Sequence, residues 1–173
     1  MKMRYLDKYR IPSARLIGYN YAQEGAYFIT ICTLNRKHFF GAVINETMHL
    51  SEIGKIVETE WNKTPGMRPD MNLGLGEYVI MPNHFHAIII IGNNSYNTNI
   101  QTIANQFGPQ RKNLASIVRG FKSSVTTRAR CLNPGFAWQS RYHESIIRNG
   151  RAFENISRYI RRNPMQWNKS ARV

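Results

Sequence analysis

The chain has 173 residues, 42% of them hydrophobic, which suits a single globular domain and argues against a disordered chain. Lys and Arg number 24 against 10 Asp and Glu, a formal net charge of +14 that favours a polyanionic partner. The alternative is a soluble basic protein without a role in nucleic-acid binding. The longest apolar run, residues 87–91, is far shorter than the roughly 18 residues of a membrane span. The N-terminus has no signal-like apolar core, and Cys32 and Cys131 form no CxxC motif, so we expect a reduced, cytoplasmic protein with no membrane partner.

Residues 1–22 form a basic arm that also contains four tyrosines. Such an arm can follow phosphates and stack on bases, or it can be a solvated tail. The arginines that we consider as DNA contacts here are Arg4, Arg10 and Arg15.

The next elements are short strands and one helix. Residues 26–33 predict a strand, and residues 39–43 and 48–50 predict a shorter pair. Ser51 can cap the N-terminus of a helix that Pro65-Gly66 ends. The apolar side chains of this helix recur at helical spacing: Ile53, Ile56, Val57 and Trp61.

The central feature is residues 77–91, EYVIMPNHFHAIIII, which predict a hairpin of two strands around Pro82-Asn83. Successive strand side chains point to opposite faces, so His84 and His86 share one face and Phe85 takes the other. Two imidazoles side by side on a rigid strand could hold a divalent metal, or they could be hydrogen-bonded core residues. A metal would need at least one further donor from another element.

Residues 92–113 are rich in Asn and Gln and predict a long polar loop. An amphipathic helix follows from Leu114, then a strand over residues 142–148, and a closing helix from about Arg151 to Asn163 that stops before Pro164. The first of these helices carries three cations that we consider as DNA contacts: Arg119, Lys122 and Arg128.

The order of elements predicts one α+β domain over residues 1–173. Strands interleaved with two crossover helices favour an antiparallel sheet with helices packed on one face, the ferredoxin-like plan.

The closing helix offers further donors, because Tyr159 and Asn163 are four residues apart on the flank of its apolar stripe. A phenol and a carboxamide edged by guanidinium groups fit a nucleophile, a metal ligand and a phosphate clamp. Alternatively, Tyr159 packs in the core and Asn163 is the helix C-cap. The neighbouring guanidinium groups are those of Arg158, Arg161 and Arg162.

Three segments, YVIMPNHFHAIIII, WQSRYHESIIRN and YIRRNP, together resemble the single-tyrosine HUH (His, hydrophobic, His) transposases. The chain is most similar to the REP-associated tyrosine transposases, and the resemblance covers about residues 11–168. The HUH motif also occurs in relaxases and replication initiators, whereas the ordered set of segments is more specific.

The resemblance implies the RRM-like HUH fold, with a C-terminal helix that carries the nucleophile. It makes His84 and His86 metal ligands, Asn163 the third ligand where related enzymes often have Gln, and Tyr159 the nucleophile. The family metals are Mg²⁺ or Mn²⁺. Three neighbouring residues receive a supporting role: Tyr142, His143 and Glu144.

The implied activity is the nicking and rejoining of hairpin-bearing, REP-like single-stranded DNA through a 5′-phosphotyrosine bond. No nucleotide-binding motif is present in the sequence, and the reaction conserves bond energy. The resemblance leaves open a monomer or a homodimer, associated with the nucleoid when bound to DNA.

Two rival functions remain at this stage. One is a domesticated transposase that binds a nucleic-acid hairpin without cutting it. The other is a metal-dependent hydrolase, for which Glu77 and Glu144 are the plausible acidic residues.

Overall fold

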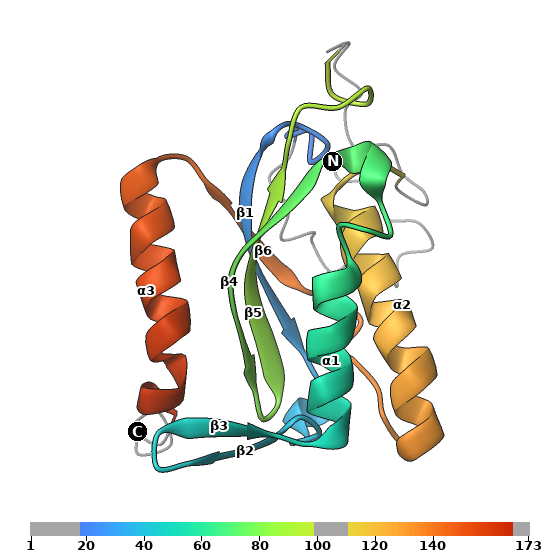
Figure 1. Ribbon diagram of the computed structural model, residues 1–173, viewed down its shortest axis with the longest axis vertical. Coiled ribbons are helices and arrows are strands. Elements are labelled where there is room, and N and C mark those ends of the chain that lie inside the picture. Colours follow the sequence, from blue (N-terminus) through green and yellow to red (C-terminus); the bar gives the residue numbers. More distant parts are fainter. Residues whose placement is uncertain (1–17, 99–110, 168–173) are drawn as a thin grey trace, which may run out of the picture.

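The computed structural model describes residues 18–98 and 111–167 (Figure 1). Arg4, Arg10 and Arg15 of the basic arm lie outside the described residues, as does much of the polar loop. The described end of the arm is packed: Tyr21 is buried, and its ring lies 4.9 Å from that of Tyr19. Both alternatives for the arm, base stacking and a solvated tail, are therefore wrong for Tyr21, whose ring belongs to the core.

Four strands form an antiparallel sheet in the order β4-β5-β1-β6. Two more strands, β2 and β3, form a separate hairpin. This order, with one helix between β1 and β4 and another between β5 and β6, is the ferredoxin-like arrangement that the sequence predicts. The strands are β1 (Gly25–Cys32), β2 (Gly41–Ile44), β3 (Thr47–Leu50), β4 (Leu73–Met81), β5 (His84–Ile91) and β6 (His143–Ile147).

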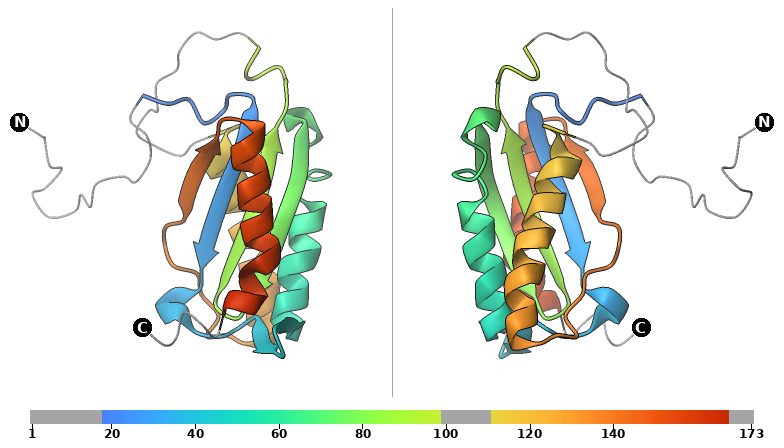
Figure 2. Two further views of the ribbon diagram at one scale, coloured as in Figure 1. Left: turned by 90° about the vertical axis from the view of Figure 1, so that its left-hand side faces the viewer. Right: turned by 90° about the vertical axis from the view of Figure 1, so that its right-hand side faces the viewer.

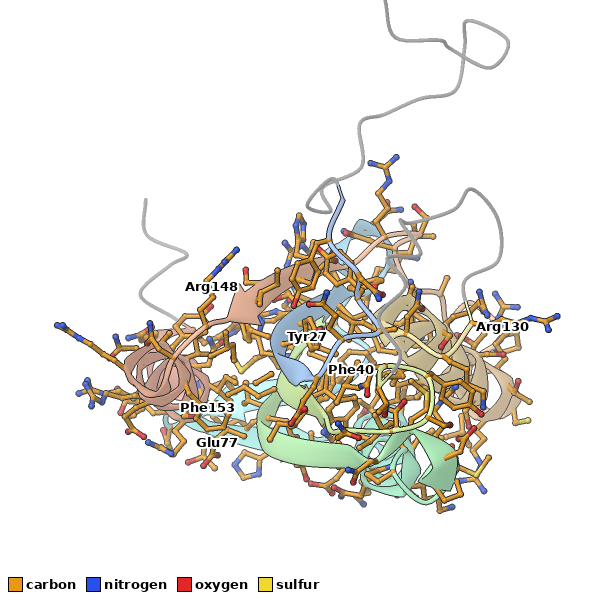
Figure 3. All side chains as sticks on the ribbon, turned by 90° about the horizontal axis from the view of Figure 1, so that it is seen from above. Tyr27, Phe40, Glu77, Arg130, Arg148 and Phe153 are labelled. Atoms are coloured by element: carbon orange, nitrogen blue, oxygen red, sulfur yellow. The ribbon has the colours of Figure 1, made fainter. Side chains whose placement is uncertain are left out.

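Helices cover both faces of the sheet (Figures 1 and 2). The two crossover helices, α1 (Glu52–Lys63) and α2 (Leu114–Leu132), pack on one face, as predicted. The closing helix, α3 (Gly150–Gln166), covers the opposite face. Seen from above, Phe153 of α3 and Glu77 of β4 lie on one side of the molecule and Arg130 of α2 lies on the other (Figure 3). None of the helices in the described ranges is long and apolar enough to cross a membrane.

The two faces of the sheet differ in their cores. Between the sheet and α1 and α2, the Trp61 ring lies edge-on to those of Phe85 and Phe121, at 5.0 and 5.3 Å between centroids. Between the sheet and α3, a smaller cluster contains the buried residues Ile88, Ile147 and Ile160. Because side chains alternate along β5, Phe85 faces the larger core, and the two histidines beside it in sequence face α3.

Helix α3 does not stop before Pro164, as the sequence suggested, but continues to Gln166. Pro164 cannot donate a hydrogen bond to the preceding turn, yet it lies in the last turn, where only one such bond is lost. The backbone of Trp167 donates to the carbonyl of Pro164 (3.3 Å) and closes the end of the helix. Asn163 is consequently an internal residue of α3, and it is not the C-cap.

Candidate metal and nucleophile site

The two histidines lie side by side at the start of β5. Their ring centroids are 4.6 Å apart, and His84 and His86 are 8% and 6% exposed. Strand β1 runs antiparallel alongside, so that Cys32 is the partner of His84 and Thr30 is the partner of His86. The pair thus lies on a central strand that is hydrogen-bonded to β4 on one side and to β1 on the other.

Each imidazole is fixed through its Nδ1 atom. His86 Nδ1 lies 2.7 Å from Thr30 Oγ1, and His84 Nδ1 lies 2.7 Å from Asn83 Oδ1. Metal-binding histidines are commonly oriented in this way, since a partner on one ring nitrogen sets the tautomer and directs the other nitrogen to the metal. The Nε2 atoms are therefore the ones available for ligation.

Burial lowers the pKa of both imidazoles, to about 4 for His84 and about 3 for His86. The positive charge of Arg36 lowers both pKa values further, neighbouring His84 adds to the effect on His86, and a hydrogen bond from His84 to Asn163 opposes the effect on His84. Both rings are neutral near pH 7, which is the form that binds metals.

Helix α3 places Tyr159 and Asn163 over the histidines. The Tyr159 hydroxyl lies 3.3 Å from His86 Nε2, and the two ring centroids are 5.4 Å apart. Asn163 is 8% exposed and hydrogen-bonds to the His84 side chain. Tyr159 is 43% exposed, so the alternative that it packs in the core does not hold. Strand β5 and helix α3 thus bring these four side chains together, although His86 and Tyr159 are 73 residues apart in sequence.

The donor set fits a divalent metal. Within the described residues, no third His, Cys, Asp or Glu joins His84 and His86 in a cluster. The amide oxygen of Asn163 is the additional donor next to the pair, and an oxygen ligand suits Mg²⁺ or Mn²⁺.

The arginines of α3 are exposed, and two of them form ion pairs with glutamates. Arg161 donates to Glu77 Oε1 (2.9 Å) on β4 and to Glu154 Oε1 (3.1 Å) in its own helix. Arg158 lies 3.8 Å from Glu154, and Arg162 is exposed beside them. Arg161 therefore links α3 to the sheet. All three arginines belong to the same helix as Tyr159.

The three cations of α2 lie on the opposite face of the sheet from Tyr159. Lys122 donates to the backbone carbonyl of Gln139 (2.6 Å), and Arg128 donates to Glu60 Oε1 (2.7 Å). Arg119 is exposed near the start of the helix. The structure does not bring these residues to the histidine pair.

The supporting residues divide between the two faces. His143 is opposite Thr30 in the sheet and hence on the α3 side, whereas Glu144 is opposite Ile29, a residue of the larger core. Tyr142 also packs against the larger core. Of the two acidic residues that a hydrolase could use, Glu144 faces away from the histidines and Glu77 pairs with Arg161.

The sequence analysis did not predict three residues that contact the histidines: Thr30, Asn83 and Trp167. Thr30 supports His86 only because of the β1–β5 register. The Trp167 ring lies 5.9 Å from that of His84 and 5.6 Å from that of His38, beyond the predicted end of α3. Asn83 could have been found, since it immediately precedes His84 in a tight turn.

Comparison with solved structures shows which known fold the chain shares. A REP-associated tyrosine transposase bound to a REP hairpin matches 90% of this chain and 74% of its own, with a TM-score of 0.59 and 18% sequence identity. At this identity the match shows a shared fold, and it confirms the predicted resemblance at that level.

Comparison of sequences gives the family. A Haemophilus influenzae protein (strain ATCC 51907 / DSM 11121 / KW20 / Rd), described as uncharacterized, is 41% identical over 162 residues, 90% of this chain and 88% of the relative. The chain belongs to the same family as this protein. No established family profile matches the chain.

Proposed function

We propose that this protein nicks and rejoins single-stranded DNA, with Tyr159 as the nucleophile. One observation carries the proposal: the Tyr159 hydroxyl lies 3.3 Å from Nε2 of His86, next to His84 and Asn163. A nucleophile beside a potential metal-binding pair is an arrangement that supports phosphodiester transfer.

His84, His86 and Asn163 would hold Mg²⁺ or Mn²⁺, with water completing the coordination. When bound, the ion would polarise the scissile phosphate and stabilise the charge that develops on its oxygens. The neutral state of the two imidazoles and their fixed Nδ1 atoms support this assignment.

The chain's own residues account for the covalent step. The phenol oxygen of Tyr159 attacks phosphorus, the bond to the 3′-oxygen breaks, and a 5′-phosphotyrosine forms. The phenol loses one proton and the departing 3′-oxygen gains one, so the step balances. A second 3′-hydroxyl can reverse the reaction and join a new end, with no nucleotide consumed. The exposed position of Tyr159 leaves the ring accessible to a bulky DNA strand.

The substrate class that we propose is hairpin-bearing DNA with an unpaired strand at the cleavage point. The net charge of +14 supports a nucleic-acid partner, and the structural neighbour was solved with a REP hairpin. Such a protein would act in the cytoplasm, at the nucleoid, as a monomer or a homodimer.

The test is to incubate the protein with end-labelled hairpin DNA and Mg²⁺ or Mn²⁺, and to resolve the products on a denaturing gel. We expect a covalent protein–DNA band that disappears in Tyr159→Phe. The matched control is Tyr96→Phe, because Tyr96 is 44% exposed, nearly the same as Tyr159, but contacts Asp70 far from the histidines. Cleavage without an adduct would indicate a hydrolase, and binding without cleavage would indicate a domesticated transposase.

A further inference from the structure

The loop between β1 and β2 lies against the histidine site and contributes a cation that the proposed cleavage does not yet use. Its first part is a single 3-10 turn, η1 (Leu34–Arg36). The His38 ring, two residues further on, lies 5.6 Å from that of Trp167, and the Trp167 ring lies 5.9 Å from that of His84. The loop is therefore in contact with the end of α3, next to His84.

The loop is fixed to the same turn that orients His84. The backbone N–H of Thr33 donates to the carbonyl of Asn83 (3.0 Å), and the Asn83 side chain lies 2.7 Å from His84 Nδ1. The buried Thr33 hydroxyl donates to the carbonyl of Lys37 (2.7 Å), and the backbone of Arg36 donates to the carbonyl of Thr33 (3.2 Å). The backbone of Arg36 is thereby held at a set position relative to the histidines.

The backbone conformation of Arg36 is unusual. Asn35 and Arg36 both have left-handed backbones, with φ of 53° and 54°. Asn adopts this conformation more readily than most residues, whereas Arg seldom does. A residue in a strained conformation persists only where its surroundings fix it, and such residues are concentrated at functional sites. The conformation of Arg36 therefore indicates that the position of its side chain matters.

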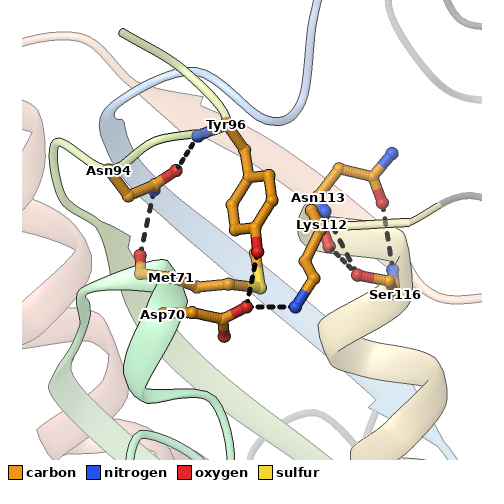
Figure 4. Close-up of polar contacts among 7 residues, drawn as sticks. All are labelled: Asp70, Met71, Asn94, Tyr96, Lys112, Asn113 and Ser116. Carbon is orange, nitrogen blue, oxygen red and sulfur yellow. Dashed lines mark hydrogen bonds and ion pairs between the residues drawn. The ribbon is translucent and has the colours of Figure 1, made fainter.

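The guanidinium of Arg36 is not neutralised by a carboxylate, unlike the ammonium group of Lys112. Lys112 pairs with Asp70, which also accepts a hydrogen bond from Tyr96 (2.8 Å), as Figure 4 shows. Arg36 is exposed and, in the part of the chain that the structure describes, forms no such ion pair. Its charge is therefore available to an anionic ligand.

The charge of Arg36 acts on both candidate metal ligands. Burial is the main cause of the low pKa of His84 and of His86, and the positive charge of Arg36 lowers both pKa values further. Because such an effect weakens with distance, the guanidinium lies near the start of β5. This is also where the Tyr159 hydroxyl meets His86.

A cation at this position suits the chemistry proposed for the site. The scissile phosphate is negatively charged, and charge shifts among its oxygens as the nucleophile attacks. A donor already held near those oxygens stabilises the transition state without a cost of reorganisation. A guanidinium is well matched to this task, because its planar fork offers two parallel N–H groups to two phosphate oxygens.

We propose that the Arg36 guanidinium contacts the non-bridging oxygens of the scissile phosphate and stabilises the charge that develops on them as Tyr159 attacks. The inference rests on the proposed function, and it deepens that function by adding a catalytic residue from the loop between β1 and β2. Arg36 keeps its proton throughout, so the balance of the covalent step does not change.

The test measures the rate of adduct formation with hairpin DNA and Mn²⁺ at saturating protein, and the affinity for the hairpin separately. Arg36→Gly is the informative variant, because glycine adopts a φ of 54° without strain and the loop should keep its shape. We expect adduct formation to be roughly 100–1,000-fold slower and the hairpin Kd to rise less than about threefold. The matched control is Lys37→Gln, which removes the neighbouring exposed cation of the loop and should leave the rate within about twofold of wild type.

Chemical rescue separates a catalytic role from a structural one. Methylguanidinium ion added to Arg36→Gly should raise the rate of adduct formation by about tenfold or more, because the ion can take the place of the missing group. The same ion should not restore Tyr159→Phe, which lacks the nucleophile. A loss of rate that methylguanidinium does not restore, or a rate within about threefold of wild type, would overturn the proposal.

A second measurement does not depend on cleavage. Thymidine 5′-monophosphate, titrated calorimetrically into the Mn²⁺-loaded protein, offers phosphate oxygens but no strand to be cut. We expect Arg36→Gly to bind it roughly tenfold or more weakly, and Lys37→Gln to bind it like the wild type. Equal binding by Arg36→Gly and the wild type would overturn the proposal.

Failure of this inference is distinguishable from failure of the proposed function. Adduct formation by the wild type and by Arg36→Gly at equal rates would contradict the role of Arg36 alone. If the wild type formed no adduct, the nicking activity would be contradicted. Weaker binding of thymidine 5′-monophosphate by Arg36→Gly would in that case still support Arg36 as a phosphate contact.

Discussion

The two faces of the sheet differ in burial and polarity, and the neighbouring residues Phe85 and His86 of β5 show the contrast. On the α1 and α2 face, Phe85 is fully buried in a large aromatic and aliphatic core. On the α3 face, His86 meets an exposed tyrosine, and the buried apolar cluster is small. One face therefore supplies most of the hydrophobic stabilisation, and the other can place polar groups close together without disrupting the core.

The largest expected effect is that of His86→Ala on cleavage. Loss of a ligand forfeits several kcal/mol of transition-state stabilisation, which corresponds to a roughly thousandfold slower reaction. Adduct formation in Mn²⁺ measures this loss, and hairpin affinity should stay within about threefold of wild type because phosphate contacts dominate binding. A parallel collapse of affinity would mean that His86 has a structural role.

Phe85→Ala tests the other face. Truncation of this fully buried ring should lower the free energy of unfolding by about 3–5 kcal/mol, because it leaves a cavity next to Trp61 and Phe121. Urea denaturation measures the change, with Leu34→Ala as an exposed control. If Phe85→Ala and His86→Ala lowered the free energy of unfolding equally, the proposed difference in stabilisation between the two faces would be contradicted.

Thr30→Val is a more selective change, since valine keeps the shape of the side chain and removes the hydroxyl 2.7 Å from His86 Nδ1. We expect Mn²⁺ affinity to fall roughly 10–100-fold, as for other residues that orient a ligand. Calorimetric titration measures the affinity, and excess Mn²⁺ should restore cleavage. Thr59→Val on α1, which loses an exposed hydroxyl bonded to the Lys55 carbonyl, should leave Mn²⁺ binding unchanged.

The smallest expected effect concerns the ion pair that joins α3 to β4. Arg161 and Glu77 are 2.9 Å apart but roughly half exposed, so solvent screens the pair and its coupling energy should be little more than the experimental error. A double-mutant cycle of Arg161→Gln and Glu77→Gln, followed by urea denaturation, measures the coupling energy. A value several times larger would show that ionic contacts, more than Ile160, hold α3 on the sheet.

Local patterns in the sequence predicted much of this structure. The alternation of side chains along β5 places His84 and His86 on one face, and the spacing of Tyr159 and Asn163 places them on one side of α3. Ser51 caps α1 by accepting from the backbone of Gly54, as its position before an apolar stripe predicts. These features depend on residues within a few positions of each other.

Other features depend on contacts between distant segments. The support of His86 by Thr30 follows from the register between β1 and β5, which no local pattern encodes. The choice of face for α3 likewise depends on how the sheet buries Ile88 and Ile147, and that choice separates Tyr159 from the cations of α2. Pro164 misled the prediction because the helix continues past it by only two residues, to Gln166, and accepts the loss of one backbone hydrogen bond.

The account's central claim is that His84, His86, Asn163 and Tyr159 form a single centre for phosphodiester transfer. The most direct measurement is mass spectrometry of the proteolysed adduct formed with hairpin DNA and Mn²⁺. We predict a nucleotide attached through phosphate to the peptide that contains Tyr159, formed by the wild-type protein and absent from His84→Ala treated in the same way. Attachment to a different tyrosine, or an undiminished adduct in His84→Ala, would contradict the account.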